Sequence, residues 1–210
     1  MSVPGGIGDV VVDRFFRRPR GMIARRWWRD PKPHHEIFRD VLAAADLAPN
    51  DRLLEVGCGG GTFLEWALRS GCSAAAVDHS LDMVRLAEAT NAAAVAEGRL
   101  EVRQAPGERL PYPDAAFICA VTMNVFFFLD GKAALAELAR VLAPGGRLVL
   151  HTVAPDPPAS VMPPLLARRM AFYDDECLAA LLRDAGFTDV AVERRGKGEL
   201  QLATARRSAP

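Results

Sequence analysis

The chain has 210 residues, and its 26 Lys and Arg residues balance 26 Asp and Glu residues, so the formal net charge at pH 7 is zero. This balance argues against a protein that binds a nucleic acid backbone or an anionic membrane through a net positive charge. Half of the residues are hydrophobic and a quarter are charged. That mixture is typical of one folded domain whose core needs neither a metal nor disulfides.

The cysteines and the apolar runs predict where the protein works. The cysteines form no C-x-x-C pair, which predicts reduced thiols rather than a disulfide framework or a metal site. The N-terminus lacks the apolar run and cleavage site of a signal peptide. No apolar stretch approaches the roughly 20 residues of a membrane span. We therefore expect a cytoplasmic protein with no metal and no membrane partner. The four cysteines are Cys58, Cys72, Cys119 and Cys177.

Residues 1–33 differ in composition from the rest of the chain. They are punctuated by Pro and Gly, rich in arginine, and contain Phe15-Phe16 and Trp27-Trp28. Residues 1–40 hold nine Lys and Arg against five Asp and Glu, a surplus too small to favour a nucleic-acid arm over other roles. We predict that residues 1–33 form a lid or arm over a second unit, residues 34–210.

From residue 34 onward, apolar periodicity predicts strands that alternate with helices. This alternation predicts a doubly wound, Rossmann-like α/β fold, with a mostly parallel seven-stranded sheet and helices on both faces. The last two strands are separated by a short turn, which predicts an antiparallel pair at one edge. Helices are predicted at 35–47, 62–70, 80–96, 132–142 and 174–185, and strands at 52–56, 73–77, 100–103, 116–122, 147–153, 188–194 and 199–205.

A glycine-rich turn joins the first predicted strand to the helix at 62–70. Gly57, Gly59 and Gly61 let the backbone turn sharply and approach a ligand closely. A dinucleotide fingerprint needs a glycine where Thr62 stands, and Glu55 would repel a pyrophosphate. A carboxylate there suits the cationic amino-acid end of S-adenosylmethionine (SAM) better.

Asp78 is the second candidate anchor for a cofactor. It stands at the predicted end of the second strand, 21 residues beyond Gly57. A carboxylate at this place accepts hydrogen bonds from the two hydroxyls of a ribose, in NAD sites and SAM sites alike. Asp78 therefore predicts a nucleotide cofactor, and the glycine spacing favours SAM over NAD.

Four segments, in order and at matching spacing, resemble the successive motifs of class I SAM-dependent methyltransferases. They are LLEVGCGGGTFLEWAL, AVDHSLDMVRLA, ERLPYPDAAF and LARVLAPGGRLVL, within residues 36–155, and FYDDECLAALLRDAGFTDVAVE extends the resemblance more weakly. The resemblance implies an enzyme in which residues 34–210 bind SAM. It implies methyl transfer to a small-molecule acceptor by in-line displacement, leaving S-adenosylhomocysteine (SAH).

The resemblance also implies roles for individual cofactor-binding residues. The glycines would cradle the methionine moiety and the ribose, Glu55 would help to place the amino group, and Asp78 would bind the ribose hydroxyls. Pro106 departs from the Asp or Ser common at its position, so the adenine amino group needs another partner, for which Gln104 is one candidate. The remaining implied cofactor-binding residues are Cys58, His79 and Met83 (these two against the adenine), Gly107 (a backbone N–H to the adenine), Glu108, and Thr122 beside the methionine carboxylate.

The catalytic group is harder to predict, because the sulfonium is already activated and a base helps only a protonated acceptor. His34 and His35 precede the first helix, His151 lies near the end of the fifth strand, and Tyr173 precedes the last helix. Each of the four is a candidate base or acceptor-orienting group, and each has an alternative structural role. Adjacent histidines lack the spacing of metal ligands, so we expect no metal site.

The segment 124–129 carries phenylalanines where many members of the family have histidine. With Trp27 and Trp28, Phe127 and Phe128 would form a wall for a planar or apolar acceptor, or they belong to the core. No Asn-Pro-Pro-Tyr motif of base-modifying methyltransferases follows the fourth strand, which favours a small molecule over a nucleic acid. Two alternatives remain: an NAD-type oxidoreductase and a SAM-binding protein that has lost transfer.

Overall fold

The computed structural model describes residues 21, 26, 29–162, 164–168 and 170–209. Phe15, Phe16, Trp27 and Trp28, and with them most of the predicted lid, lie outside the described residues. The strands are β1 (Arg52–Val56), β2 (Ser73–Asp78), β3 (Leu100–Gln104), β4 (Phe117–Met123), β5 (Leu142–Val153), β6 (Phe187–Arg195) and β7 (Leu200–Arg207). The α-helices are α3 (His35–Ala45), α4 (Thr62–Ala67), α5 (Leu81–Thr90), α6 (Ala92–Ala96), α7 (Gly131–Val141), α8 (Pro164–Ala167) and α9 (Asp175–Asp184), with the 3-10 turns η2 (Lys32–His34), η3 (Leu68–Ser70) and η4 (Phe126–Phe128).

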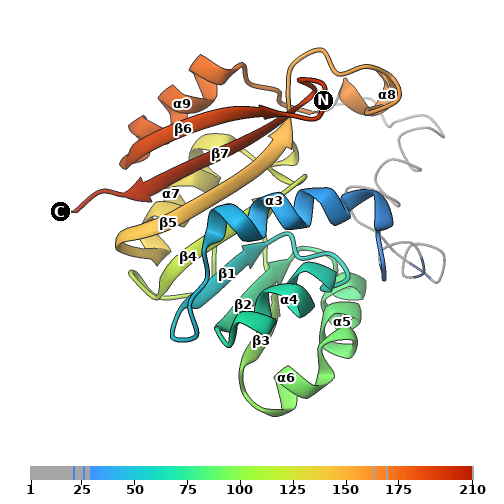
Figure 1. Cartoon of the computed structure of the whole chain (residues 1–210), viewed down its shortest axis with the longest axis vertical. Helices are drawn as coiled ribbons and strands as arrows, with labels where there is room; N and C mark the ends of the chain where they lie inside the picture. The colour runs from blue at the N-terminus through green and yellow to red at the C-terminus, as the bar shows by residue number, and fades with distance from the viewer. Residues whose placement is uncertain (1–20, 22–25, 27–28, 163, 169, 210) are drawn as a thin grey trace, which may run out of the picture.

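The seven strands form one sheet in the order β3-β2-β1-β4-β5-β7-β6 (Figure 1). β1 pairs in parallel with β2 and with β4, while β7 is antiparallel to both β5 and β6. The predicted fold class, a mostly parallel seven-stranded sheet with an antiparallel edge pair, is therefore confirmed. The strand order reverses direction between β1 and β4, and in such sheets ligands bind outside the carboxyl ends of the strands at that point.

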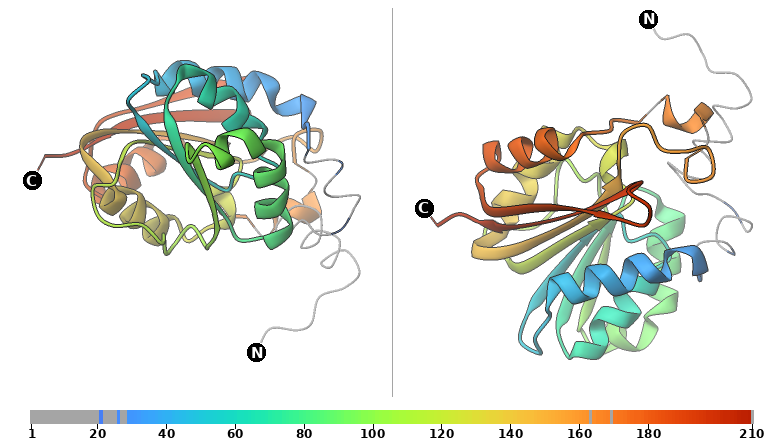
Figure 2. Two further views of the ribbon diagram at one scale, coloured as in Figure 1. Left: turned by 90° about the horizontal axis from the view of Figure 1, so that it is seen from below. Right: turned by 45° about the horizontal axis from the view of Figure 1, so that its top comes forward.

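Helices cover both faces of the sheet, as predicted (Figure 2). α3, α4, α5 and α6 bury their apolar sides on one face, together with the strand residues Leu53 and Val121. α7 and α9 pack on the other face, together with Leu54 and Ala120. Successive strand residues point to opposite faces, so both sides of β1 and β4 are apolar.

Two predicted elements differ most from those in the structure. The helix predicted over 80–96 breaks at Asn91, whose side-chain amide donates to the carbonyl oxygens of Gly61 and Ala87, both at 3.0 Å. Ser80 occupies the N-cap position of α5, although its hydroxyl makes no capping hydrogen bond. The fifth strand begins at Leu142 rather than at residue 147, because α7 ends at Val141 and the chain pairs with Phe117 at once.

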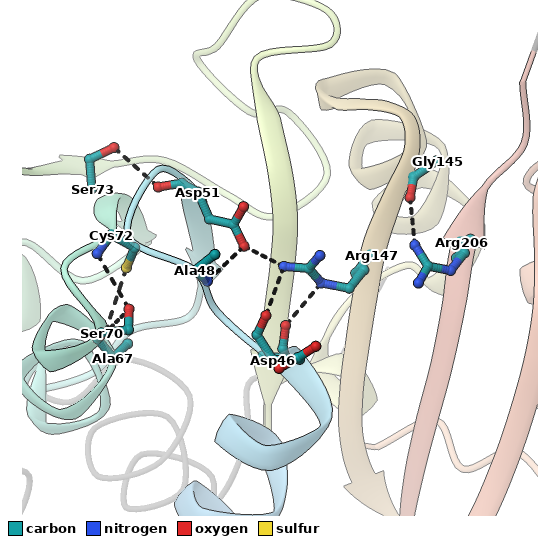
Figure 3. A network of polar contacts seen from close by, with 11 residues as sticks. Asp46, Ala48, Asp51, Ala67, Ser70, Cys72, Ser73, Gly145, Arg147 and Arg206 are labelled. Carbon is teal, nitrogen blue, oxygen red and sulfur yellow. Dashed lines mark hydrogen bonds and ion pairs between the residues drawn. The ribbon is translucent and has the colours of Figure 1, made fainter.

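Arg147 on β5 fixes the position of α3 across the sheet (Figure 3). Its Nε donates to the carbonyl oxygen of Ala45 at 2.9 Å, and its Nη2 donates to that of Asp46 at 3.2 Å and forms an ion pair with Asp51. The carbonyls at a helix C-terminus need such donors, because they have no partner within the helix. With its last turn held in this way, α3 presents its first residues at the opposite end of the sheet.

Among the described residues, no helix is long and apolar enough to cross a membrane.

Candidate functional site

A cavity of about 210 Å³ opens at the carboxyl ends of β1, β2 and β4, where the strand order reverses. The loop after each of these strands contributes to its wall, and α3 closes it from one side. The lining residues come from 55–60, 77–79, 105–108 and 123–125, with Pro31, His34, Phe38, Thr62, Phe63, Met83, Phe128 and Leu129.

The glycine loop after β1 is held by hydrogen bonds to the end of β2. The backbone N–H groups of Gly57 and Cys58 both donate to the carbonyl oxygen of Val77, at 2.8 and 3.2 Å. Gly57 has a φ of +81°, and a Cβ built there would lie 2.3 Å from Cγ2 of Val125. A side chain is therefore excluded at residue 57 by backbone strain and by the close approach of the loop after β4.

Gly61 serves helix packing rather than the cavity surface. It is not a lining residue, and a Cβ there would lie 2.7 Å from Nδ2 of Asn91 and 2.8 Å from Cα of Ala87. The loop can therefore lie against α5 only because residue 61 has no side chain. Gly59, Gly57 and Cys58, by contrast, do line the cavity.

Asp78 lies in the cavity wall and also anchors the glycine loop. Its Oδ2 accepts the backbone N–H of Gly59 at 3.0 Å, and its Oδ1 accepts that of Ser80 at 2.8 Å. Burial raises the pKa of Asp78, while these two N–H groups and neighbouring His79 oppose the rise. Each carboxylate oxygen has a further lone pair, so Asp78 can also accept hydrogen bonds from the hydroxyls of a ligand.

Glu55 is the second carboxyl group of the cavity, and it is only 2% exposed. Burial, followed by the charge of Asp78, raises its pKa to about 8. Its Oε2 makes no hydrogen bond with any described residue. A buried, unpartnered carboxyl oxygen facing a cavity fits a cationic group of a ligand, because an ammonium would supply both the missing donor and the missing charge.

The residues predicted to contact an adenine are divided between the cavity wall and its surroundings. His79, Met83, Gly107 and Glu108 line the cavity. Gln104 does not line it, and its amide donates to the carbonyl oxygen of His79 at 3.0 Å. Glu108 also accepts the backbone N–H of Asp130 at 3.1 Å, which ties this loop to the start of α7.

Thr122 lies behind the cavity wall. It is fully buried, does not line the cavity, and its Oγ1 makes no hydrogen bond with any described residue. Its neighbours Met123, Asn124 and Val125 reach the cavity instead. The sequence analysis did not name Phe38 or Met123 as site residues, because helical periodicity gives Phe38 a core position and nothing local marks which residues after β4 face the cavity. Asn124 belongs to the segment 124–129 that the sequence analysis singled out.

Only one of the two adjacent histidines faces the cavity. His34 lines it, and burial, followed by the proximity of His35, lowers its pKa. His35 is not a lining residue. Its Nε2 lies 2.7 Å from Oδ1 of Asp30, and its ring packs on Trp66 with 5.0 Å between the centroids.

His151 and Tyr173 lie outside the cavity wall. His151 is 1% exposed, and its Nδ1 lies 3.0 Å from Oδ1 of Asn124, which does line the cavity. Burial, followed by the nearby charges of His34 and Arg195, lowers the pKa of His151 to about 4. The ring of Tyr173 packs against Phe126, with 5.7 Å between the ring centroids.

The three consecutive phenylalanines have three different environments. Phe126 is fully buried in the core beneath α7, and Phe127 is buried against Val153 and Met162. Phe128 lines the cavity and also contacts the cluster around Phe127. Phe127 therefore belongs to a core cluster, and Phe128 lies in the cavity wall.

No group of three or more His, Cys, Asp or Glu side chains in the described part of the chain is arranged to hold a metal ion.

The strand order, the glycine loop and the carboxylate at the end of β2 define a Rossmann-like protein with a nucleotide-cofactor site at its switch point. Comparison with known proteins specifies the family. Residues 54–150 match the family model described as "Methyltransferase domain". An O-methyltransferase from Pyrenophora dematioidea is 31% identical over 198 residues, which cover 87% of this chain and 74% of that protein.

Two further proteins are similar to the chain. The ubiquinone/menaquinone biosynthesis C-methyltransferase UbiE of Geotalea daltonii is 37% identical over 148 residues, 68% of this chain and 59% of that protein. A solved structure of geranyl diphosphate methyltransferase in complex with SAM superimposes with a TM-score of 0.70 at 15% identity, covering 91% of this chain and 92% of that one. The chain belongs to the class I SAM-dependent methyltransferases, and SAM is its methyl donor.

Proposed function

We propose that this enzyme transfers the methyl group of SAM to a small organic acceptor, in the cavity at the switch point of the sheet. The observation that carries the proposal is that two chemically different sets of residues line this cavity, which we call its acidic part and its apolar part. One part holds the glycine loop and the two buried acids, Glu55 and Asp78. The other is lined by the apolar side chains of Phe38, Phe128 and Leu129.

The acidic part fits SAM by its chemistry. Glu55 would accept a hydrogen bond from the α-ammonium group. This bond would give Oε2 the partner that it lacks among the described residues. Asp78 would accept from the ribose hydroxyls, and Met83 and His79 would lie against the adenine. When bound, SAM supplies a methyl group on a positively charged sulfur, which needs no further activation.

The remaining functional residues would serve the cofactor less directly. Cys58, Gly57 and Gly59 would present the loop backbone, and Gly107 and Glu108 would border the adenine. Gln104 would orient the backbone of His79 through its hydrogen bond to the carbonyl oxygen of that residue. Thr122, which is fully buried, would contribute to the packing behind the cavity wall.

The apolar part supports an acceptor with an apolar, planar body. Phe38, Phe128 and Leu129 exclude water and hold such a body in the orientation that an in-line displacement requires. His34 lines the same cavity, and because burial lowers its pKa, its ring is neutral at pH 7. It would take up the proton of an acceptor that carries one. The names of the relatives, an O-methyltransferase and a quinone C-methyltransferase, support small organic acceptors of this kind.

We also propose that residues 1–33 act as a lid on the domain formed by residues 34–210. Two hydrogen bonds support this: Thr62 Oγ1 donates to the carbonyl oxygen of Arg29 at 3.0 Å, and the N–H of Gly21 donates to Oδ2 of Asp82 at 2.9 Å. Pro31 is buried in the cavity wall. The last residues of the predicted lid thus contribute to one side of the cavity wall.

The test combines cofactor binding with a transfer assay. Calorimetry should detect SAH binding and no NADH binding; the reverse result would favour an oxidoreductase. SAM with a labelled methyl group is then incubated with phenols, quinols, DNA and RNA. Transfer to a phenol or quinol is the expected result, whereas label found only on a nucleic acid would overturn the proposed acceptor class.

A further inference from the structure

Asn124 has an unusual backbone conformation at the edge of the cavity. It follows the last residue of β4 and has a φ of +55°. This is the left-handed region of backbone conformation, which residues other than glycine rarely adopt. Its backbone N–H donates to the carbonyl oxygen of His151 at 3.0 Å, and its Oδ1 lies 3.0 Å from Nδ1 of the same histidine. Two contacts from one buried residue on β5 therefore fix both the backbone and the side chain of Asn124.

The contact with His151 decides which end of the Asn124 amide is left for a ligand. An amide oxygen only accepts hydrogen bonds, so the Nδ1 of His151 must carry the proton that it donates. Burial lowers the pKa of His151 to about 4, so its ring is neutral and has one N–H group at pH 7. Asn124 then presents its Nδ2 amino group, which makes no hydrogen bond within the described part of the chain.

This donor lies in an otherwise apolar stretch of the wall. Its neighbours Met123 and Val125, and Phe128 beyond them, also line the cavity and contribute no side-chain hydrogen-bond donor. Val125 lies against the glycine loop, since a Cβ built at Gly57 would lie 2.3 Å from its Cγ2, so Asn124 is next to the loop that would hold the cofactor. An amide donor surrounded by apolar side chains selects ligands that place a hydrogen-bond acceptor there.

We propose that Asn124 recognises the acceptor by donating a hydrogen bond from Nδ2 to one of its oxygen atoms, and that His151 is the positioning residue that turns the Asn124 amide. The acceptor then belongs to a definite class: an apolar, ring-bearing molecule with a phenolic, enolic or carbonyl oxygen at or beside the methylated atom. This inference rests on the proposed function, because it assumes that the acceptor occupies the apolar part of the cavity.

The test uses SAH-loaded protein and two pairs of probes, 2-acetylnaphthalene with 2-isopropylnaphthalene and 1-indanone with indane. Only the ketone of each pair has an oxygen that accepts a hydrogen bond, and no member of either pair donates one. Asn124→Asp keeps the shape of the side chain and replaces the donor by an acceptor. Asn124→Gly removes the side chain and relieves the backbone at φ +55°, so this variant should fold even if the first does not. His151→Asn keeps a donor near the position of Nδ1, whereas His151→Leu removes it.

We expect the affinity of the wild-type protein for at least one ketone, divided by its affinity for the matching hydrocarbon, to be about tenfold higher than the same ratio in variants without the donor, a difference worth one well-placed hydrogen bond. Asn124→Asp, Asn124→Gly and His151→Leu should show the lower ratio, and His151→Asn should retain the wild-type ratio. All four variants should bind SAH with the wild-type affinity. Nitrogen-15 NMR should show His151 as the Nδ1–H tautomer.

Each other outcome overturns the inference in a distinguishable way. A wild-type protein that binds SAH but neither ketone, or whose ratio of ketone affinity to hydrocarbon affinity equals that of Asn124→Gly, contradicts the assigned acceptor class. A parallel loss of SAH affinity in the Asn124 variants would place Asn124 in the cofactor site. An Nε2–H tautomer would remove the role given to His151. Failure of the wild-type protein to bind SAH would instead overturn the proposed function itself.

Discussion

The backbone N–H of Gly59 donates a hydrogen bond of 3.0 Å to Oδ2 of Asp78, which joins the loop after β1 to the end of β2. One carboxylate thus holds the glycine loop in place and remains able to accept hydrogen bonds from a ligand. Cofactor affinity and loop geometry are therefore coupled through a single side chain.

Replacing Asp78 by Ala should weaken SAH binding by about 1–3 kcal/mol, because charge-assisted hydrogen bonds to the ribose are lost and the loop loses an anchor. Isothermal titration calorimetry measures the change. Asp184→Ala, at an exposed position near the end of α9, is the control and should leave the affinity unchanged. Equal affinities of Asp78→Ala and wild type would mean that Asp78 does not bind the ribose.

Glu55 should release a proton when SAH binds. Burial and Asp78 raise its pKa from 4.5 to about 8, so at pH 7 the folded, ligand-free protein holds a proton that the unfolded chain has lost. The contribution of Glu55 to stability therefore falls as pH rises between these two values. A bound ammonium group lowers the pKa again, and Glu55 ionises.

Calorimetry at pH 7 in phosphate and in Tris should show this release of about one proton as a difference in binding enthalpy between the two buffers. Glu55→Gln cannot ionise and should lose the difference. Identical enthalpies for the wild-type protein in both buffers would show that Glu55 keeps its protonation state on binding.

Gly61→Ala should destabilise the fold by roughly 2–4 kcal/mol, the sum of left-handed backbone strain and of overpacking against Asn91 and Ala87. Gly98→Ala is the matched control, because its φ is also positive, at +70°, but a Cβ there meets nothing within 4 Å. It should cost about 1 kcal/mol from strain alone. Urea unfolding measures both. Equal losses of stability in Gly61→Ala and Gly98→Ala would mean that α5 moves away from residue 61 at no cost in free energy.

Arg147→Ala should destabilise the protein by about 1–3 kcal/mol, since it leaves the C-terminal carbonyls of α3 and the carboxylate of Asp51 without their donor. Arg206→Ala removes an exposed arginine that donates to the carbonyl of Gly145 in the same region (Figure 3), and should change stability by less than about 0.5 kcal/mol. Thermal and urea unfolding compare the two. If both variants lose the same stability, α3 is held by packing alone.

Deletion of residues 1–28 should reduce methyl transfer much more than it reduces the melting temperature or the SAH affinity, because the residues proposed to bind the cofactor lie in residues 34–210. Circular dichroism, calorimetry and a transfer assay with labelled SAM follow the three properties. Aggregation of the shortened chain would show that these residues belong to the core rather than to a lid.

Much of the fold follows from local patterns in the sequence. Alternating strands and helices, the glycine loop at 57–61 and an acid at the end of β2 depend on backbone sterics and on apolar periodicity within about ten residues of each position. These signals placed β1 at Arg52–Val56 and β2 up to Asp78, as found. They also predicted the carboxyl edge of the sheet as the cofactor site, because parallel strands end at the same edge.

The acceptor side of the cavity was decided by tertiary structure. His34 and His35 are adjacent in sequence, yet one lines the cavity and the other packs on Trp66, because the first turn of α3 points them in different directions. Asn124 and His151 meet only because β4 and β5 pair in the register that places Met123 beside His151. No local pattern encodes that register, since it results from packing β4 and β5 between two helical layers. The sequence by itself therefore determined the glycine loop and the strand ends, and only the assembled sheet determined which side chains face the cavity.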